Sequence, residues 1–350
     1  MSHPLHQLIE PLPSPGKIKQ TLFLSPAGEH FIHRSRETVR AILDQKDPRL
    51  LVIVGPCSIH DPDSAIEFAR RLIILQKETQ DSFFLVMRVY SEKSRTKTGW
   101  KGLLNDPFLD STEDIAAGLH ITRQLLLDLN TMQIPTATEF LDPLSACYYD
   151  DLITWGCIGA RTSESQTHRL MASDLPMPIA FKNSTQGCVD VAINGMFSAS
   201  CPHRKISIDH NGGVCVKQTL GNPDLHIALR GGVKGANYKK ENIKALLEQL
   251  QKHSLPEKIL IDCSHDNSPN DECEQESVFM NILEQIENGN TAIRGMILES
   301  HLQGGKQKMD LGTPLAPEIS ITDPCLSWEK TASLIQTGAM LRGKTATCAL

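Results

Sequence analysis

Eight short apolar runs, most of them followed by a longer helical pattern, constrain this chain of 350 residues more than any other feature. Each run is continuous rather than alternating, which is typical of a parallel strand that is covered on both faces. Eight such units in roughly 250–300 residues fit a closed (β/α)8 TIM barrel better than an open doubly wound sheet. The strong runs are LLVIV (centred on 51–54), FFLVM (83–87), PIAF (178–181), HIAL (226–229), KILI (258–261) and GMIL (295–298), and the weaker ones are IPTAT (134–138) and CIGA (157–160).

The segments between these runs carry apolar residues at helical spacing. In PDSAIEFARRLIILQKE, Asp61 suits the N-cap position and Pro62 the first helical position. The segments 241–252 and 276–289 repeat the pattern, and Gly289 suits the end of the second one. The sequence therefore predicts helices around the outside of the barrel.

Two segments lie outside this pattern. Residues 1–48 are Pro-rich at their start and amphipathic later, and we interpret them as an extension that packs on the barrel or on a partner subunit. Residues 203–222 alternate in polarity around Asn211-Gly212-Gly213, which predicts a β-hairpin inserted before the sixth strand. We therefore divide the chain into an oligomer-forming or regulatory extension (1–48) and a catalytic barrel (49–350) that carries the hairpin 203–222.

The composition excludes several functional classes. A net charge of −6 argues against a general nucleic-acid binder, and no apolar run approaches the roughly 18 residues of a membrane span. The N-terminus lacks the apolar core of a secretory signal. The ten cysteines form no CxxC pair, so neither a zinc ribbon nor a disulfide framework is indicated. We expect a cytoplasmic protein that binds neither nucleic acid nor membrane.

Ionisable residues follow every one of the eight runs. A single charge after an apolar run usually marks the place where a strand surfaces, but barrel enzymes build their active sites at the C-terminal ends of the strands. Eight ionisable residues that converge on one barrel mouth therefore indicate a bound ligand. They are Cys57, Arg88, Glu139, Arg161, Lys182, Arg230, His265 and Glu299.

Many of these residues are cations, and the stretch 87–102 adds more. Arginine binds phosphate and carboxylate in bidentate fashion, and lysine adds a point charge. So many cations indicate more than one anionic group, for example two phosphates and a carboxylate. The cationic group is Arg88, Lys93, Arg95, Arg161, Lys182 and Arg230.

A second group offers a thiol, an imidazole and two carboxylates. It consists of Cys57, His265, Glu299 and Asp323, the last from the segment ISITDPC. Mixed soft and hard ligands suit a divalent transition metal, although their spacing matches no short metal motif such as HExxH.

Long motifs occur along the chain in a fixed order. They are VGPCSIHDP, MRVYSEKSRTKTGWKGLLNDP, IGARTSESQTHR, FKNSTQG, LRGG, IDCSHDNS, ESH and SITDPC. Together they closely resemble 3-deoxy-D-arabino-heptulosonate 7-phosphate (DAHP) synthase, in its shorter, metal-dependent microbial class with members that are feedback-regulated by aromatic amino acids. The resemblance covers nearly the whole chain.

The resemblance implies a (β/α)8 barrel with an N-terminal extension and an inserted hairpin. It implies the condensation of phosphoenolpyruvate with erythrose 4-phosphate, with release of phosphate, as the first step of the shikimate pathway towards aromatic amino acids. It also implies a homodimer or homotetramer and a possible aromatic amino acid effector. The implied divalent metal is Mn²⁺, Fe²⁺, Co²⁺ or Zn²⁺, because a thiolate ligand disfavours Mg²⁺.

The family pattern also suggests a role for each site residue. The implied metal ligands are Cys57, His265, Glu299 and Asp323. The implied ligands of phosphoenolpyruvate are Arg161 and Arg230 for the phosphate, Arg88 and Lys182 for the carboxylate, and Glu139 near the phosphate. Lys93 is implied to lie between the two substrates, and Arg95 with Thr96 at the sugar phosphate. The implied catalytic residues are Lys93, Cys57 and His265.

The sequence departs from the family pattern at several positions. KPRT reads Lys93-Ser94-Arg95-Thr96 here, which loosens the loop but keeps both cations. KNGT reads Lys182-Asn183-Ser184-Thr185, so a side chain replaces a glycine near the site. The departures in the regulatory region are Ala146-Cys147 for Pro-Gln, Pro176 for a serine, and Lys205 and Lys217 at usually apolar hairpin positions. We therefore expect an altered effector pocket.

Three other functions remain open from the residues. Lys182 at a strand end could be the nucleophile of a Schiff-base aldolase, although neighbouring arginines and the four metal-type ligands argue against it. The related 3-deoxy-D-manno-octulosonate 8-phosphate synthase shares the barrel and phosphoenolpyruvate, but the KSRT stretch and the extension favour DAHP synthase. A non-enzymatic binder of aromatic amino acids would not need intact strand-end residues.

Overall fold

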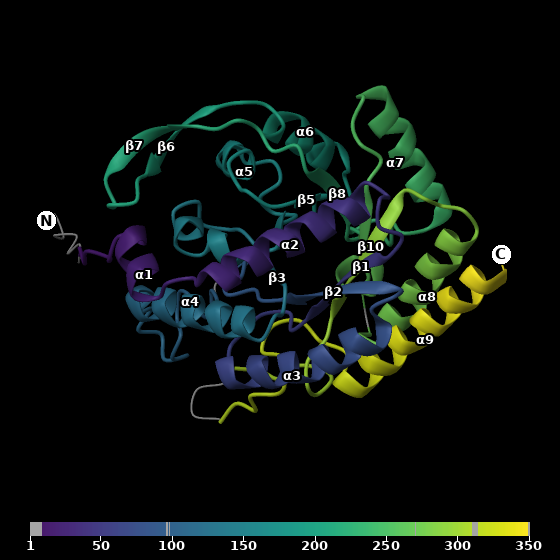
Figure 1. The fold of residues 1–350 in the computed structure, drawn as a ribbon, viewed down its shortest axis with the longest axis horizontal. Helices are drawn as coiled ribbons and strands as arrows, with labels where there is room; N and C mark the ends of the chain where they lie inside the picture. The colour runs from purple at the N-terminus through teal and green to yellow at the C-terminus, as the bar shows by residue number, and fades with distance from the viewer. Residues whose placement is uncertain (1–8, 96, 98, 270, 310–313, 349–350) are drawn as a thin grey trace, which may run out of the picture.

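The computed structural model describes residues 9–95, 97, 99–269, 271–309 and 314–348. Within them, eight parallel strands close into a barrel in the order β1-β10-β9-β8-β5-β4-β3-β2 (Figure 1). Every predicted apolar run overlaps one of these strands, and the predicted (β/α)8 barrel is confirmed. The strands are β1 (Leu50–Gly55), β2 (Phe83–Arg88), β3 (Thr136–Glu139), β4 (Trp155–Ile158), β5 (Ile179–Lys182), β8 (Leu225–Leu229), β9 (Ile259–Asp262) and β10 (Ile293–Glu299).

One predicted strand is displaced along the sequence. The run CIGA at 157–160 was expected to form the fourth strand, but β4 begins at Trp155 and ends at Ile158. It ends there because the carbonyl of Gly159 accepts hydrogen bonds from the backbone N–H groups of Thr162 and Ser163, which closes a turn. Arg161 therefore lies in this turn, beyond the end of the strand.

Helices connect most of the strands on the outside of the barrel. The predicted cap of α3 is present, since the Asp61 side chain accepts a hydrogen bond from Ser64 N at 2.7 Å and Pro62 begins the helix. Gly289 follows α8 with a φ of 91°, as expected of a residue that ends a helix. The helices are α1 (Pro15–Thr21), α2 (Pro26–Leu43), α3 (Pro62–Thr79), α4 (Ile115–Thr131), α5 (Gln166–Ala172), α6 (Asp190–Ala199), α7 (Lys240–Lys252), α8 (Glu274–Glu287) and α9 (Trp328–Cys348), with short 3₁₀ turns η1 (Ser145–Tyr148), η2 (Asp150–Leu152) and η3 (His265–Asn267).

The barrel interior is apolar at one end and polar at the other. Val39 and Ile42 of α2 belong to the same buried cluster as Leu51 and Trp155, so α2 covers the N-terminal ends of the strands. At the opposite ends, four strands finish on buried ionisable side chains. These are Arg88, Lys182, Asp262 and Glu299. The polar end of the interior is where a barrel enzyme has its active site.

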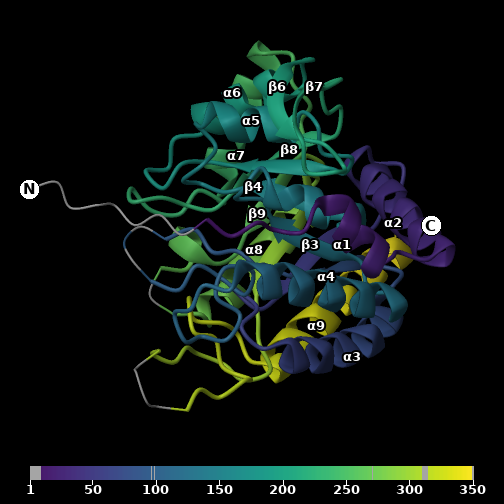
Figure 2. The same ribbon diagram turned by 90° about the vertical axis from the view of Figure 1, so that its left-hand side faces the viewer.

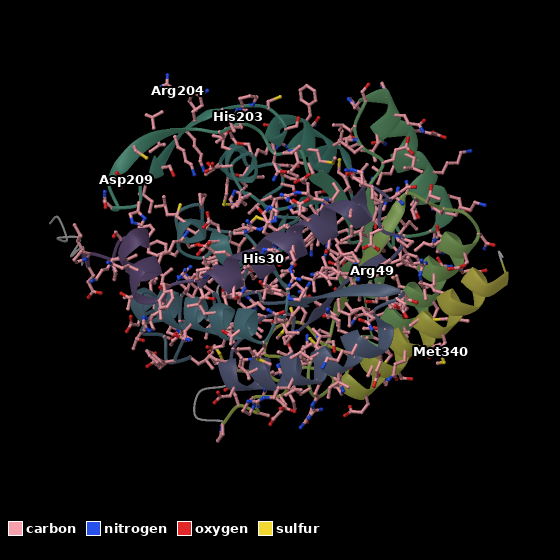
Figure 3. All side chains as sticks on the ribbon, viewed as in Figure 1. His30, Arg49, His203, Arg204, Asp209 and Met340 are labelled. Atoms are coloured by element: carbon pink, nitrogen blue, oxygen red, sulfur yellow. The ribbon has the colours of Figure 1, made fainter. Side chains whose placement is uncertain are left out.

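The predicted hairpin is present as β6 (Arg204–Ile208) and β7 (Val214–Gln218), which pair antiparallel. Gly212 in its turn has a φ of 84°, which glycine adopts readily. The hairpin, α5 and α6 lie at one end of the molecule and α3 with α9 at the other (Figure 2). Arg204 and Asp209 project from the hairpin at the periphery of the molecule (Figure 3).

The hairpin and the extension contact each other. The N–H group of Gly16, in α1, donates a 2.8 Å hydrogen bond to the carbonyl of His210 beside the hairpin turn. The two hairpin lysines both pair with Asp174, Lys205 at 3.1 Å and Lys217 at 2.8 Å. At these positions, which are usually apolar in the family pattern, the two lysines thus share one carboxylate, and the Lys217 side chain is also 47% exposed.

No helix in the part of the chain that the structure describes is both long enough and apolar enough to span a membrane.

Candidate active site

A cavity of about 800 Å³ opens at the C-terminal ends of the strands. Three further predicted residues lie beneath this lining. Cys57 contacts it through Asp323 and Arg88 through Glu299, whereas Lys182 pairs with the buried Asp262, which in turn contacts His265 of the lining. Thr96 lies outside the described residues. The predicted residues that line the cavity are Lys93, Arg95, Glu139, Arg161, Arg230, His265, Glu299 and Asp323. The strand-end residues therefore converge on one space, as the sequence predicted.

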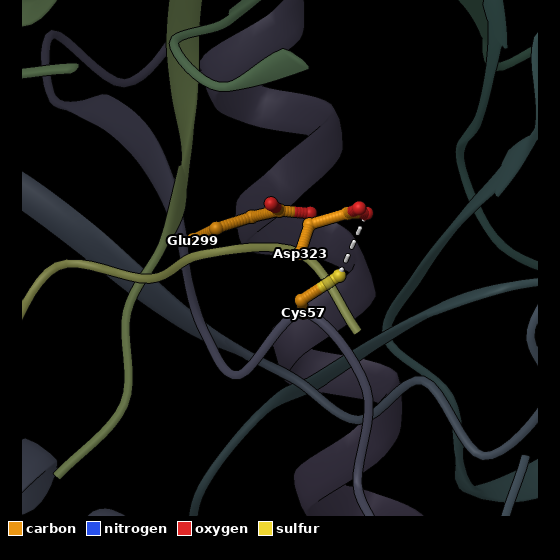
Figure 4. Close-up of side chains that lie close together, drawn as sticks. All are labelled: Cys57, Glu299 and Asp323. Carbon is orange, nitrogen blue, oxygen red and sulfur yellow. Dashed lines mark hydrogen bonds between the residues drawn. The ribbon is translucent and has the colours of Figure 1, made fainter. Parts of the chain in front are cut away.

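Three predicted metal ligands come together on one side of this cavity (Figure 4). One donor atom each from Cys57, Glu299 and Asp323 lie within 4.8 Å of one another, and Cys57 Sγ lies 3.2 Å from Asp323 Oδ2. His265 is adjacent, with Nε2 3.8 Å from Glu299 Oε1. A thiol, an imidazole and two carboxylates in this arrangement fit a divalent transition metal ion.

Lys93 lies directly against this group. Its Nζ is 2.7 Å from Cys57 Sγ and 3.0 Å from Asp323 Oδ2. Burial opposes the charge of Lys93, but the nearby Cys57 and Asp323 outweigh it and raise the pKa of the lysine, which therefore stays protonated. The Lys93 charge in turn lowers the pKa of Asp323. Burial raises the pKa of the Cys57 thiol, and a bound cation would reverse that preference because metal ligation requires the thiolate.

Asp262 is a site residue that the sequence reasoning missed. It is fully buried, and its Oδ2 lies 2.8 Å from Lys182 Nζ and 3.1 Å from His265 Nδ1. Burial opposes its charge, but Lys182 and then His265 outweigh it and lower the pKa of Asp262 well below its usual value. The contact between Asp262 and Nδ1 orients the His265 ring, so that the other ring nitrogen, Nε2, faces Glu299.

His265 has an unusual backbone conformation. Its φ of 59° lies in the left-handed region, which is uncommon for residues other than glycine, although asparagine, aspartate and histidine adopt it more often than the rest. The ring is held by Asp262 and by the Ser264 hydroxyl, 2.7 Å from Nδ1. Strained backbone of this kind is concentrated at functional sites, where the surroundings over-determine the conformation.

Arg88 is completely buried beneath the cavity. Its Nη2 donates to Glu299 Oε1 at 3.0 Å, and its guanidinium lies 4.0 Å above the centre of the Tyr90 ring. Its Nη1 has no hydrogen-bond partner among the described residues. A buried donor without a partner is expensive, so this nitrogen is suited to an anionic oxygen of a ligand.

The remaining cations lie closer to solvent. Arg230 pairs with Asp266 of the next strand-end loop, a partner that the sequence reasoning also missed, and Arg95 and Arg161 are exposed at the rim. Glu139 packs closely against Gly159, since a Cβ at that position would meet the Glu139 carboxylate unless this side chain moved.

The serine that replaces a glycine in the KNST motif fits its position. Ser184 has no positive φ and its hydroxyl accepts a hydrogen bond from Cys188 N at 3.1 Å, which helps to close the turn 184–188. The backbone after Lys182 therefore does not require glycine in this chain.

Residues 30–336 match the model of the DAHP synthetase I family. The Tyr-sensitive phospho-2-dehydro-3-deoxyheptonate aldolase of Escherichia coli K12 is 46% identical over 326 residues, which cover 93% of this chain and 91% of that protein. The Phe-sensitive enzyme of the same organism is 46% identical over 305 residues, 87% of each chain. The tyrosine-inhibited enzyme of Schizosaccharomyces pombe is 43% identical over 329 residues, 93% of this chain and 88% of that protein.

A solved structure shows the same fold. The phospho-2-dehydro-3-deoxyheptonate aldolase of Francisella tularensis SCHU S4 superposes with a TM-score of 0.93 at 41% identity. The match covers 95% of this chain and 97% of that one, so it includes the extension and the hairpin as well as the barrel.

Proposed function

The chain belongs to the DAHP synthetase I family, whose reaction is an aldol-type condensation that gives 3-deoxy-D-arabino-heptulosonate 7-phosphate, and we propose which of its side chains carry that reaction. The substrates are phosphoenolpyruvate and erythrose 4-phosphate, and the reaction is the first step of aromatic biosynthesis. The observation that carries the proposal is that four predicted cations line one cavity beside a metal-type ligand set, with two further cations buried beneath it.

The cations suit the three anionic groups of the two substrates. We assign Arg161 and Arg230 to the phosphate of phosphoenolpyruvate, with Glu139 beside it. Arg88 and Lys182 are assigned to its carboxylate, which the unpartnered Nη1 of Arg88 supports. We assign Arg95, with Thr96, to the phosphate of the sugar.

These assignments have a physical purpose. Two anionic substrates repel each other. Cations that are fixed by buried carboxylates neutralise the substrates and hold them in the orientation that the reaction requires. Lys182 is already fixed by Asp262, and Arg88 by Glu299. Neither cation has to reorganise when the substrate binds.

The chemistry takes place beside Lys93. Water adds at C2 of phosphoenolpyruvate, from which the phosphate leaves, and C3 attacks the aldehyde carbon. Negative charge develops on the aldehyde oxygen until this oxygen takes up a proton. The protonated Lys93, between Cys57 and Asp323, is positioned to stabilise that charge. A divalent metal held by Cys57, His265, Glu299 and Asp323 would supply Lewis acidity at the same place. Its identity is proposed as Mn²⁺, Fe²⁺, Co²⁺ or Zn²⁺.

We assign the segment 1–48 and the hairpin 203–222 to assembly and regulation, and residues 49–350 to the catalytic barrel. Three relatives are named as Tyr-sensitive, Trp-sensitive and Phe-sensitive enzymes. These names support an aromatic amino acid as the effector of this protein. We propose a cytoplasmic homodimer or homotetramer whose response to that effector is weak, because Pro176, Lys205 and Lys217 alter the pocket.

Phosphate release from the two substrates together tests the function. The assay should show release with erythrose 4-phosphate and little with arabinose 5-phosphate, the substrate of the octulosonate enzyme. Inactivation by borohydride in the presence of substrate would instead identify Lys182 as a Schiff-base nucleophile. No release with either sugar would favour a binding protein.

A further inference from the structure

Glu92 is a buried carboxylate that the proposed chemistry does not use. It is 4% exposed, precedes Lys93 and contributes to the lining of the cavity. Its Oε2 accepts two hydrogen bonds, from Ser145 Oγ at 2.9 Å and from Tyr149 OH at 2.8 Å. No ion pair joins it to a cation in the described ranges.

A carboxylate in this place is expensive. Burial, with a smaller contribution from the neighbouring Asp142, raises the pKa of Glu92 to about 7, although the two hydroxyl donors oppose the rise. An isolated buried charge destabilises a fold unless something compensates it. Sites where a sequence breaks such a rule are often functional.

The backbone around Glu92 begins a segment whose residues Lys93, Ser94, Arg95 and Lys97 line the cavity. Leu104 N donates to Ser91 O at 2.9 Å, and Lys93 N donates to Lys101 O at 2.8 Å. Gly102 has a φ of 113°, and a Cβ there would lie 2.7 Å from Glu92 Cα. The two arms of the 91–104 loop are thus pressed together at Glu92, with Arg95 in the part beyond it.

The partners of Glu92 belong to a segment that is itself firmly held. Ser145 begins η1, and its hydroxyl is 3.0 Å from the carbonyl of Asp142. Tyr149 follows η1, is buried, and stacks on Phe140 with an interplanar angle of 5°. Glu92 therefore joins the base of a loop to a fixed part of the barrel.

We propose that Glu92 is a positioning residue, which locks the base of the 91–104 loop to η1 through Ser145 and Tyr149 and so holds Lys93 and Arg95 in place at the cavity. The inference rests on the proposed function, because that function gives the loop its contacts with the sugar phosphate. It assigns Glu92 no contact with substrate or metal.

The lock also connects the mouth to the extension. Tyr148 OH, in η1, donates to the carbonyl of Pro13 at 2.9 Å, and Lys19 of α1 lies 2.7 Å from Asp150. The loop, η1 and α1 therefore form one series of contacts.

Kinetics of three variants test the lock. Glu92→Ala should raise KM for erythrose 4-phosphate by about 10-fold or more, which is the low end for losing charge-assisted hydrogen bonds, and change KM for phosphoenolpyruvate little. Tyr149→Phe, which keeps the ring on Phe140, should shift KM in the same direction by a smaller factor. Combined with Glu92→Ala it should add nothing, because both remove the same contact. Glu92→Gln, which keeps an acceptor oxygen, should restore most of the affinity.

Glu113→Gln is the matched control. Glu113 is an exposed carboxylate that pairs with Lys101 of the same loop at 2.8 Å, and its loss should leave both KM values unchanged. Equal changes in KM for the two substrates on Glu92→Ala, or additive effects of Glu92→Ala and Tyr149→Phe, would contradict the proposal.

Limited digestion with trypsin gives a second test that does not depend on activity. The loop carries cleavage sites at Lys93, Arg95, Lys97 and Lys101. Cleavage there should be faster in Glu92→Ala and Tyr149→Phe than in the wild type or Glu113→Gln. Unchanged cleavage would overturn the lock even if the chain catalyses the condensation, and faster cleavage would support the lock even if it does not.

Discussion

The barrel mouth and the hairpin use lysine in different ways. Lys182 at the mouth has a side chain that is 4% exposed, with a completely buried carboxylate as its partner. Lys217 on the hairpin is 47% exposed and shares Asp174 with Lys205. Removing one partner of a buried pair leaves an uncompensated charge, whereas an exposed pair is screened by water. Lys182 is therefore held in one position at the mouth, whereas Lys217, the exposed member of the hairpin group, can be replaced without loss of the fold.

The comparison predicts its largest effect at the mouth. Cys57→Ala and His265→Ala should each lose bound metal and at least about 100-fold in activity, because each removes a direct ligand where even outer partners are worth about 10- to 100-fold. The fold should survive. Metal analysis together with circular dichroism checks this, and full metal occupancy in both purified variants would contradict the ligand assignment.

The second effect separates the two substrates within the mouth. Arg95→Ala should raise KM for erythrose 4-phosphate far more than for phosphoenolpyruvate, with a loss in kcat/KM of roughly 10- to 150-fold for a charge-assisted hydrogen bond worth about 1.5–3 kcal/mol. Arg161→Ala should show the reverse preference. Steady-state kinetics with each substrate varied in turn measures both, and equal changes would give these arginines a shared role.

A smaller effect is expected in the hairpin region. Phenylalanine, tyrosine and tryptophan should inhibit only weakly if the hairpin forms the proposed effector pocket, because Lys205, Lys217 and Asp174 would place three charges beside the aromatic ring. Titration of each amino acid at substrate concentrations near KM checks this. Potent inhibition by phenylalanine at micromolar concentration would show that the altered pocket still functions.

The smallest effect concerns stability and pH. The pKa of Glu92 is raised to about 7 in the folded protein, which means that the fold favours the protonated side chain. This stabilisation is fully present below the unfolded pKa of about 4.3 and is lost as the pH rises through 7. The wild type should therefore lose about 2 kcal/mol relative to Glu92→Gln between pH 5 and pH 8. Thermal unfolding of both proteins across this range measures the difference. If the stability of the two proteins changes with pH in the same way, the pKa of Glu92 is not raised in the folded protein.

The fold and the positions of the site residues could be predicted because both depend on local pattern. Continuous apolar runs identify buried strands, and the residue after each run must lie at the barrel mouth. The partners across the barrel could not be predicted in this way. Three such contacts join residues that are 36 to 80 positions apart, and no sequence spacing specifies them. They are Lys182 with Asp262, Arg230 with Asp266, and Tyr149 with Glu92.

A local signal for one of them was nevertheless present. Asp262 directly follows the run KILI and precedes His265 by three residues. A metal-binding histidine commonly donates its second ring N–H group to a carboxylate of this kind. For Glu92 the signal was weaker, since it is the single acidic residue in the cationic stretch 87–102. Its burial could be learned only from the structure.

Phosphate release measured during removal and return of metal tests the central claim most directly. The claim is that the strand ends of the barrel form one metal-dependent site for two phosphorylated substrates. Dialysis against a chelator should abolish phosphate release from phosphoenolpyruvate and erythrose 4-phosphate, and Mn²⁺ should restore it at about one equivalent per chain. Release that continues at the full rate in metal-free protein would contradict the account.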